Sequence, residues 1–151
     1  AFAKVRSARD CRLVILGEGK ERDNLSALAH ELGIQEDFRL PGYRDNPFAY
    51  LNKASLYVLS SVWEGSPNTL IEALAVGVPV VSTDCKSGPQ EILEGGRYGP
   101  LVSVGDVDAL ARAIEATLDN PPKKAYLQSA AERYRVDRCA RAYLRLLIKG
   151  R

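Results

Sequence analysis

The sequence predicts an α/β fold built on a doubly wound parallel sheet with helices on both faces. Short apolar runs alternate with helical patterns along the whole chain. The runs lack the regular polar residues of a half-exposed strand, which is typical of parallel strands covered on both sides. The chain has 151 residues, 46% of them hydrophobic and 26% charged, and this mixture fits one globular domain of ordinary size.

The short apolar runs are the expected strands. Each has the length of a buried strand and is rich in leucine or β-branched side chains. The first two runs end in Gly17-Glu18-Gly19 and Pro41-Gly42, which are sequences that stop a strand. In chain order the expected strands cover residues 13–16, 38–40, 55–59, 78–82 and 100–102.

Helical patterns fill the segments between these strands. The expected helices cover 20–32, 67–76 and 107–119, and a further helix begins at Pro121-Pro122. Gly33 and Gly77 follow the first two of these helices as C-terminal stops, and Asp106 is placed to cap the third.

The C-terminal segment is a two-faced helix. Its apolar side carries Val136, Ala140, Tyr143, Leu144 and Leu147, and its basic side carries Arg138, Arg141, Arg145 and Lys149. One interpretation is a packed helix with a solvated basic face. The other is a helix that meets a membrane surface or a partner.

Charge and composition exclude several classes of protein. Lys plus Arg is 21 and Asp plus Glu is 19, and the net charge of +2 gives no argument for nucleic acid. No apolar run approaches the roughly 18 residues of a membrane span. Cys11, Cys85 and Cys139 lie far apart and favour reduced thiols in the cytosol. His30 has no partner histidine, so we expect no metal site. We also expect no cofactor.

The loop between residues 60 and 67 is the candidate site, because ligands of open α/β sheets bind beyond the carboxyl ends of strands. Ser66 is a candidate helix cap and Pro67 suits the first helical position. Free backbone N–H groups at that helix start attract phosphate. Glu64 before the helix and Glu72 inside it are placed to hold hydroxyl groups on two sides of a diphosphate, as in a nucleotide sugar. The alternative is a loop acid and a surface salt bridge.

This stretch resembles a known signature. Glu64-x7-Glu72, followed by residues 73–81, is similar to the donor-binding motif of the retaining glycosyltransferases of family 4. These enzymes have two facing Rossmann-like domains, the GT-B architecture. The resemblance covers nearly the whole chain. It extends to residues 13–19, 38–43, 87–93, 96–102 and 106–110.

The resemblance implies roles for the residues of the motif. Glu64 contacts hydroxyls of the transferred sugar and is the catalytic candidate, while Glu72 binds the ribose hydroxyls. The backbone near the helix start approaches the sugar and phosphates. The residues concerned are Gly65, Ser66, Pro67, Asn68, Thr69 and Leu70. Many family members have Gly-Phe-Gly where this chain has Gly65-Ser66-Pro67, which leaves open which amide faces the sugar.

Other segments are implied to bind the base. Gly42, Tyr43 and Arg44 lie along it, and for Arg44 a plain surface charge is the alternative. Gly17 and Gly19 keep the backbone close to the floor of the site, unless they only form a strand-ending turn. For Glu91 both a role in placing a loop over the donor and a structural salt bridge stay open.

Compared with the family, this sequence starts inside the first helix. The first strand, two diphosphate-binding cations and the acceptor-binding domain are expected to be missing. Residues 1–151 are thus expected to be the C-terminal donor domain of a larger enzyme, inactive alone. Loss of a central strand predicts an exposed sheet edge. Either this edge pairs with another chain, or the two strands on either side of the missing one pair directly with each other.

The resemblance implies transfer from a nucleotide diphosphate sugar, with UDP favoured, to a glycan or lipid-linked acceptor in bacterial surface polysaccharide synthesis. Such an enzyme works in the cytoplasm, peripherally at the inner membrane face. A non-catalytic nucleotide-binding or assembly module is the alternative. A sugar-nucleotide epimerase is a third, against which the pair Glu64 and Glu72 argues.

Overall fold

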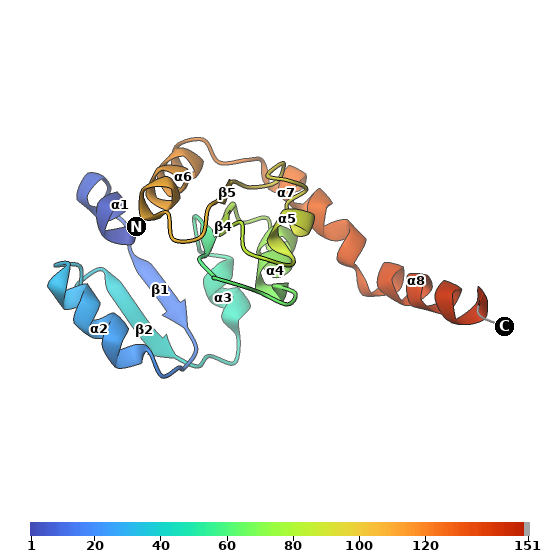
Figure 1. Ribbon diagram of the computed structural model, residues 1–151, viewed down its shortest axis with the longest axis horizontal. Coiled ribbons are helices and arrows are strands. Elements are labelled where there is room, and N and C mark those ends of the chain that lie inside the picture. The colour runs from blue at the N-terminus through green and yellow to red at the C-terminus, as the bar shows by residue number, and fades with distance from the viewer. Residues whose placement is uncertain (150–151) are drawn as a thin grey trace.

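The structure, a computed structural model, describes residues 1–149 and has the expected parallel α/β organisation (Figure 1). Gly150 and Arg151 lie outside the described residues. The strands are β1 (Leu13–Leu16), β2 (Phe38–Gly42), β3 (Tyr57–Leu59), β4 (Val80–Thr83) and β5 (Leu101–Val102). Every pairing between them is parallel, which confirms the predicted fold class.

Helices connect these strands as expected. They are α1 (Phe2–Ala8), α2 (Arg22–Glu31), α3 (Pro47–Leu51), α4 (Asn68–Val76), α5 (Pro89–Ile92), α6 (Val107–Asp119), α7 (Lys124–Ala131), the 3₁₀ helix η1 (Glu132–Tyr134) and α8 (Val136–Lys149). The Asp106 carboxylate accepts from the Ala109 N–H at 2.8 Å and caps α6, as predicted. The helix expected at Pro121-Pro122 instead begins at Lys124, because the backbone is still extended at Lys123.

The strands form two separate sheets rather than one. β1 pairs with β2, and β3, β4 and β5 form a three-stranded sheet in that order. β1 and β3 are not paired, so the expected direct closure of neighbouring strands is not observed. Although β1 pairs with β2, Val14 and Ile15 remain 44% and 38% exposed. The expectation of full burial is thus wrong for β1, whereas all of β4 is buried.

The main core lies between the three-stranded sheet and helices α4 and α7. Leu70, Leu74 and Leu127 have no exposed surface there. Gly77 ends α4 in the left-handed conformation, with φ of 81°, as a helix stop should. This packing fixes α4 against β3 and β4, and therefore fixes where the helix begins.

A smaller core joins α1 to α6. Val5 packs there with Ala111 and Ile114. The Lys4 ammonium pairs with the Asp108 carboxylate at 2.8 Å across the same two helices. The N-terminal helix is thereby attached to the half of the molecule that contains the three-stranded sheet.

Helix α8 extends away from the rest of the molecule (Figure 1). The interpretation of a packed helix is wrong in this structure, because the apolar side of α8 is exposed. Its exposed residues include Val136, Tyr143, Leu144 and Leu147. The side chain of Lys149 lies outside the described part of the structure. Among residues 1–149, no helix is both long and apolar enough to cross a membrane.

The buried face of α4 provides a stability test. Leu74→Ala removes a side chain with no exposed surface and should lower the free energy of unfolding by about 2–5 kcal/mol. Leu146→Ala on α8 is the matched control, because Leu146 is 72% exposed, and should change it by less than about 0.5 kcal/mol. Urea unfolding followed by circular dichroism measures both. Equal losses in the two variants would contradict the assigned core.

Candidate functional site

The loop between β3 and α4 is held in place at several points. The Thr83 hydroxyl on β4 donates to the Ser61 carbonyl at 2.6 Å, and the Ser61 hydroxyl donates to the Glu64 carboxylate at 2.6 Å. The Glu64 N–H donates to the Lys86 carbonyl at 3.3 Å, next to a parallel bridge between Trp63 and Lys86. Glu64 is therefore fixed through both its backbone and its side chain.

Helix α4 begins differently from the sequence expectation. Pro67 is itself the N-cap, and no side chain caps the helix. The role predicted for the Ser66 side chain as a cap is thus wrong: its carbonyl instead accepts from the Asn68 N–H at 2.9 Å. Leu70, the last of the predicted donor-binding residues in this run, is buried, and its N–H donates to the Pro67 carbonyl at 3.0 Å.

Backbone donors remain available around this helix start. Within residues 1–149, the N–H groups of Gly65, Ser66 and Thr69 donate no hydrogen bond. The partial positive charge of the helix terminus adds to these donors. The arrangement suits an anion such as a phosphate.

Two carboxylates flank this helix start. Glu64 precedes it, and Glu72 lies half-buried one turn inside α4. Glu72 forms no ion pair within the described residues, which argues against the alternative of a surface salt bridge. Both carboxylates lie close enough to Tyr57 to act on it. Burial raises the pKa of the Tyr57 phenol, and the negative charges of Glu64 and Glu72 raise it further.

Tyr57 supports the helix start from β3. Its hydroxyl donates to the Thr69 hydroxyl at 2.7 Å. When the phenol loses its proton, the Thr69 hydroxyl can donate to the phenolate instead, which opposes the upward shift of the Tyr57 pKa. The sequence prediction did not include this residue. A tyrosine at the start of an apolar strand carries no signal that its hydroxyl reaches a helix twelve residues later.

The loop after β4 lies against the same helix start. Gly88 has φ of 99°, and a Cβ there would collide with the ring of Pro67. Ser87 has φ of 67°, an uncommon conformation for a residue with a side chain. The sequence prediction included only Glu91 from this region. Glu91 forms no ion pair among the described residues, and its backbone carbonyl accepts from Arg133.

The predicted base-binding residues lie at the ends of β1 and β2. The Gly17 N–H donates to the Gly42 carbonyl at 2.9 Å, and both glycines have positive φ, 102° and 81°. A Cβ on Gly42 would collide with the Glu18 carboxylate, which Arg22 holds at 2.9 Å. A hollow of about 150 Å³ lies beside this contact and is lined by Gly17, Glu18, Gly19, Arg22 and neighbouring apolar residues.

The two remaining base-binding candidates are on the surface. Tyr43 is largely exposed. Arg44 donates from Nε to the Tyr50 hydroxyl at 3.1 Å and from Nη1 to the Tyr43 carbonyl at 3.1 Å. These bonds restrain the guanidinium, although it stays exposed. Gly19 has no neighbour within 4 Å of an added Cβ, so nothing in the protein itself requires a glycine there.

The candidate residues thus form two groups. One lies at the ends of β1 and β2, and the other around the start of α4. The arrowheads of β1 and β2, where the first group lies, are at the lower left in Figure 1. No hydrogen bond joins the two groups within the described chain. In that part of the chain, no three His, Cys, Asp or Glu residues gather to hold a metal ion.

Taken together, these features define an α/β domain in which a helix start with free backbone N–H groups is flanked by two carboxylates. The chain belongs to the family of glycosyl transferases group 1, whose model matches residues 1–134. The expected resemblance to the GT-B glycosyltransferases is confirmed.

Curated relatives of this chain include bacterial glycosyltransferases. The chain is 39% identical over 134 residues to N-acetylgalactosamine-N,N'-diacetylbacillosaminyl-diphospho-undecaprenol 4-alpha-N-acetylgalactosaminyltransferase of Campylobacter jejuni, covering 88% of this chain and 36% of that protein. It is 36% identical over 140 residues to the lipopolysaccharide core biosynthesis glycosyltransferase LpsE of Rhizobium meliloti, covering 89% and 41%. The chain therefore spans well under half the length of these relatives.

Solved structures share the fold. The apo form of the lipopolysaccharide outer core galactosyltransferase WaaB superposes with a TM-score of 0.83 at 22% identity, over 99% of this chain and 45% of that one. A TarM variant from S. aureus, solved with fondaparinux, alpha-GlcNAc-glycerol and UDP, superposes with a TM-score of 0.83 at 26% identity, over 95% and 30%.

Tyr57 gives a pH-dependent test of the site geometry. Tyr57→Phe removes the hydrogen bond to Thr69 and should lower the free energy of unfolding by about 1 kcal/mol at neutral pH. The raised pKa means that the folded state holds the phenol proton more tightly than the unfolded state. The stability from Tyr57 is therefore complete below pH ~10 and is lost as the pH rises through the raised pKa.

The measurement is urea unfolding of wild type and variant from neutral to alkaline pH. The difference between the two proteins should shrink above pH ~10. Tyr143→Phe is the control, because Tyr143 is largely exposed on α8. A difference that stays constant through the alkaline range would contradict the raised pKa of the Tyr57 phenol.

Proposed function

We propose that this chain is the donor-binding part of a retaining glycosyltransferase that takes its sugar from a nucleotide diphosphate. The observation that carries the proposal is the start of α4, where three free backbone N–H groups lie between Glu64 and Glu72. A nucleotide sugar has the matching order of groups: a sugar with hydroxyls, a diphosphate, and a ribose with hydroxyls.

Each part of the donor has its own contacts in this proposal. Glu72 accepts hydrogen bonds from the ribose hydroxyls, and Glu64 from hydroxyls of the transferred sugar. The N–H groups of Gly65, Ser66 and Thr69 meet the diphosphate. The base lies toward the ends of β1 and β2, along Gly42, Tyr43 and Arg44, with Gly17 and Gly19 at the floor. Pro67 and Asn68 shape the helix start between these contacts.

The chemistry of transfer is mainly electrostatic. When the bond to the sugar breaks, positive charge develops at the anomeric carbon and negative charge on the departing diphosphate. The α4 start stabilises the leaving diphosphate. Glu64 holds the sugar in place while positive charge develops at its anomeric carbon. No step in this proposal requires a metal ion.

The substrates are proposed from the relatives. UDP is favoured as the nucleotide, since it is bound in the TarM structure to which this chain is 26% identical. A hexose or N-acetylhexosamine is the proposed sugar, and a growing glycan or lipid-linked acceptor its target, as the names of the relatives suggest. The proposed location is the cytoplasm, at the inner face of the membrane. We expect residues 1–151 alone to bind donor without transferring sugar.

Glu72 provides the first test. Glu72→Ala should weaken UDP binding by about tenfold or more, because a charge-assisted hydrogen bond contributes about 1.5–3 kcal/mol. Ligand-observed NMR titrations of this chain with UDP, GDP and ADP measure the affinity and the choice of base. Glu31→Ala, at an exposed position of α2, is the matched control and should bind as wild type does.

The same titration separates the rival function. Selective binding of one nucleotide that disappears in Glu72→Ala supports the donor site. A nucleotide-binding or assembly module with another site would bind equally well in wild type and variant. Absence of binding by any of the three nucleotides to the wild-type chain would refute the donor site proposed for it.

Glu64 should behave differently from Glu72. Glu64→Ala should leave the affinity for UDP within about twofold of wild type but should remove most of the additional affinity that a UDP-sugar has over UDP. The comparison of UDP with UDP-galactose and UDP-N-acetylglucosamine in both proteins tests this. Equal loss of UDP and UDP-sugar binding would show that Glu64 does not face the sugar.

A further inference from the structure

The side chain of Thr69 adds a hydroxyl group to the helix start at which backbone N–H groups are free. Thr69 is exposed, and its hydroxyl accepts a hydrogen bond from the Tyr57 hydroxyl at 2.7 Å. A threonine inside a helix commonly donates its proton to the carbonyl four residues earlier. For Thr69 that residue is Gly65, which lies before the helix. Within residues 1–149 the Thr69 hydroxyl donates to no protein group, so its proton is free for a ligand.

Tyr57 reaches this hydroxyl from a fixed position on β3. Its backbone pairs with Val80 of β4, and its N–H donates to the Pro79 carbonyl at 2.9 Å. Its side chain packs against the main core. The strand and the core therefore hold the phenol oxygen in place, while the Thr69 hydroxyl that it contacts faces the exposed side of α4.

The direction of this hydrogen bond follows from the acidity of the two hydroxyls. A phenol is a stronger acid than an aliphatic hydroxyl, so Tyr57 is the donor and Thr69 the acceptor. Burial raises the pKa of the Tyr57 phenol, and the negative charges of Glu64 and Glu72 raise it further, so the phenol keeps its proton. A hydroxyl that accepts such a bond still has its own proton to donate and becomes a stronger donor.

We propose that Tyr57 is a positioning residue of the donor site, which orients the Thr69 hydroxyl as a hydrogen-bond donor to the diphosphate of the nucleotide sugar; this rests on the function proposed for the α4 start. The hydroxyl joins the free backbone N–H groups of Gly65, Ser66 and Thr69. A hydrogen bond to a charged phosphate oxygen is stronger than one to a neutral acceptor. Thr69 thus contributes to the affinity for the diphosphate in particular.

The diphosphate is the part of the donor that matches this hydroxyl. The hydroxyls of a sugar or a ribose need acceptors, which the carboxylates of Glu64 and Glu72 supply. A diphosphate has only acceptor oxygens and needs donors. Thr69 is the second residue of α4, so its hydroxyl lies in the first turn, where the partial positive charge of the helix terminus also favours an anion.

Single variants test both members of the pair in titrations with UDP, followed by ligand-observed NMR. Thr69→Val keeps the branched shape without the hydroxyl and should weaken UDP binding about tenfold. Thr69→Ser restores a hydroxyl and should recover most of that loss. Tyr57→Phe keeps the ring but no longer orients the Thr69 hydroxyl, and should weaken UDP binding about threefold. Unchanged UDP affinity in Thr69→Val overturns the proposal.

The double variant separates positioning from a general effect on the fold. If Tyr57 acts through Thr69, adding Tyr57→Phe to Thr69→Val should weaken UDP binding by less than about a further 1.5-fold. If Tyr57 only stabilises the domain, Tyr57→Phe weakens UDP binding by the same factor with and without the Thr69 hydroxyl. That second result overturns the positioning role.

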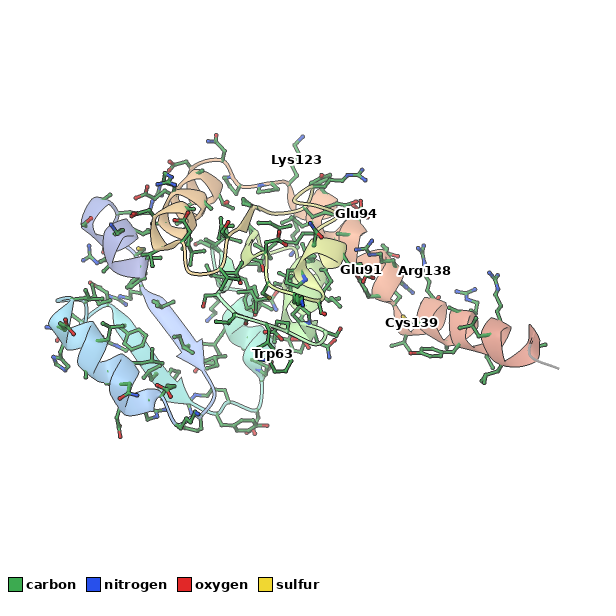
Figure 2. All side chains as sticks on the ribbon, viewed as in Figure 1. Trp63, Glu91, Glu94, Lys123, Arg138 and Cys139 are labelled. Atoms are coloured by element: carbon green, nitrogen blue, oxygen red, sulfur yellow. The ribbon has the colours of Figure 1, made fainter. Side chains whose placement is uncertain are left out.

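Tyr126→Phe is the matched control. The Tyr126 hydroxyl on α7 likewise donates to another segment, at 2.9 Å from the Arg97 carbonyl. Lys123, just before α7, lies at the upper side of the molecule in Figure 2, whereas Trp63, in the loop before α4, lies at the lower side. Tyr126→Phe should therefore lose a similar hydrogen bond but keep UDP affinity within about twofold. Equal losses of UDP affinity in Tyr126→Phe and Tyr57→Phe overturn the proposal.

Failure of this proposal and failure of the proposed function give different results. A wild-type chain whose UDP binding is weakened by Glu72→Ala, but not by Thr69→Val, keeps its donor site and overturns only the roles of Tyr57 and Thr69. A wild-type chain that does not bind UDP overturns both.

Discussion

The burial of helix α4 is the constraint on which the candidate site depends. Leu70 and Leu74 have no exposed surface, and they attach the helix to the three-stranded sheet and to α7. A helix held in this way cannot shift along its axis without disrupting the core. Its first turn, with free backbone donors and Glu72 one turn later, is therefore positioned by the packing of these two leucines.

Short polar contacts extend this positioning from the helix to the loops around it. Thr83 on β4 holds the loop that carries Glu64, and Tyr57 on β3 holds Thr69 at the helix start. The absence of a side chain at Gly88 lets the next loop lie against Pro67.

Local signals were the ones that could be predicted from the sequence. Gly77 and Asp106 end and begin helices through contacts within a few residues. The motif around Glu64 and Glu72 indicated the candidate site, which remains a prediction. Contacts between distant segments could not be predicted, because no local pattern marks them. The hydrogen bond from Tyr57 to Thr69 is one example. The division of the sheet and the exposure of α8 likewise depend on which elements pack against each other. Local secondary-structure propensity does not show which elements these are.

The divided sheet also gives the two halves of the molecule unequal resistance to local unfolding. Between residues 11 and 50, only Ala29 and Gly42 are buried, whereas the main core lies entirely beyond residue 50. The β1–β2 half should therefore open at a lower free-energy cost than the rest. A nucleotide that contacted both halves, as proposed, would bind only the form in which the β1–β2 half is folded. Part of its binding free energy would then be spent on ordering the weaker half, so its measured affinity depends on residues that never touch it.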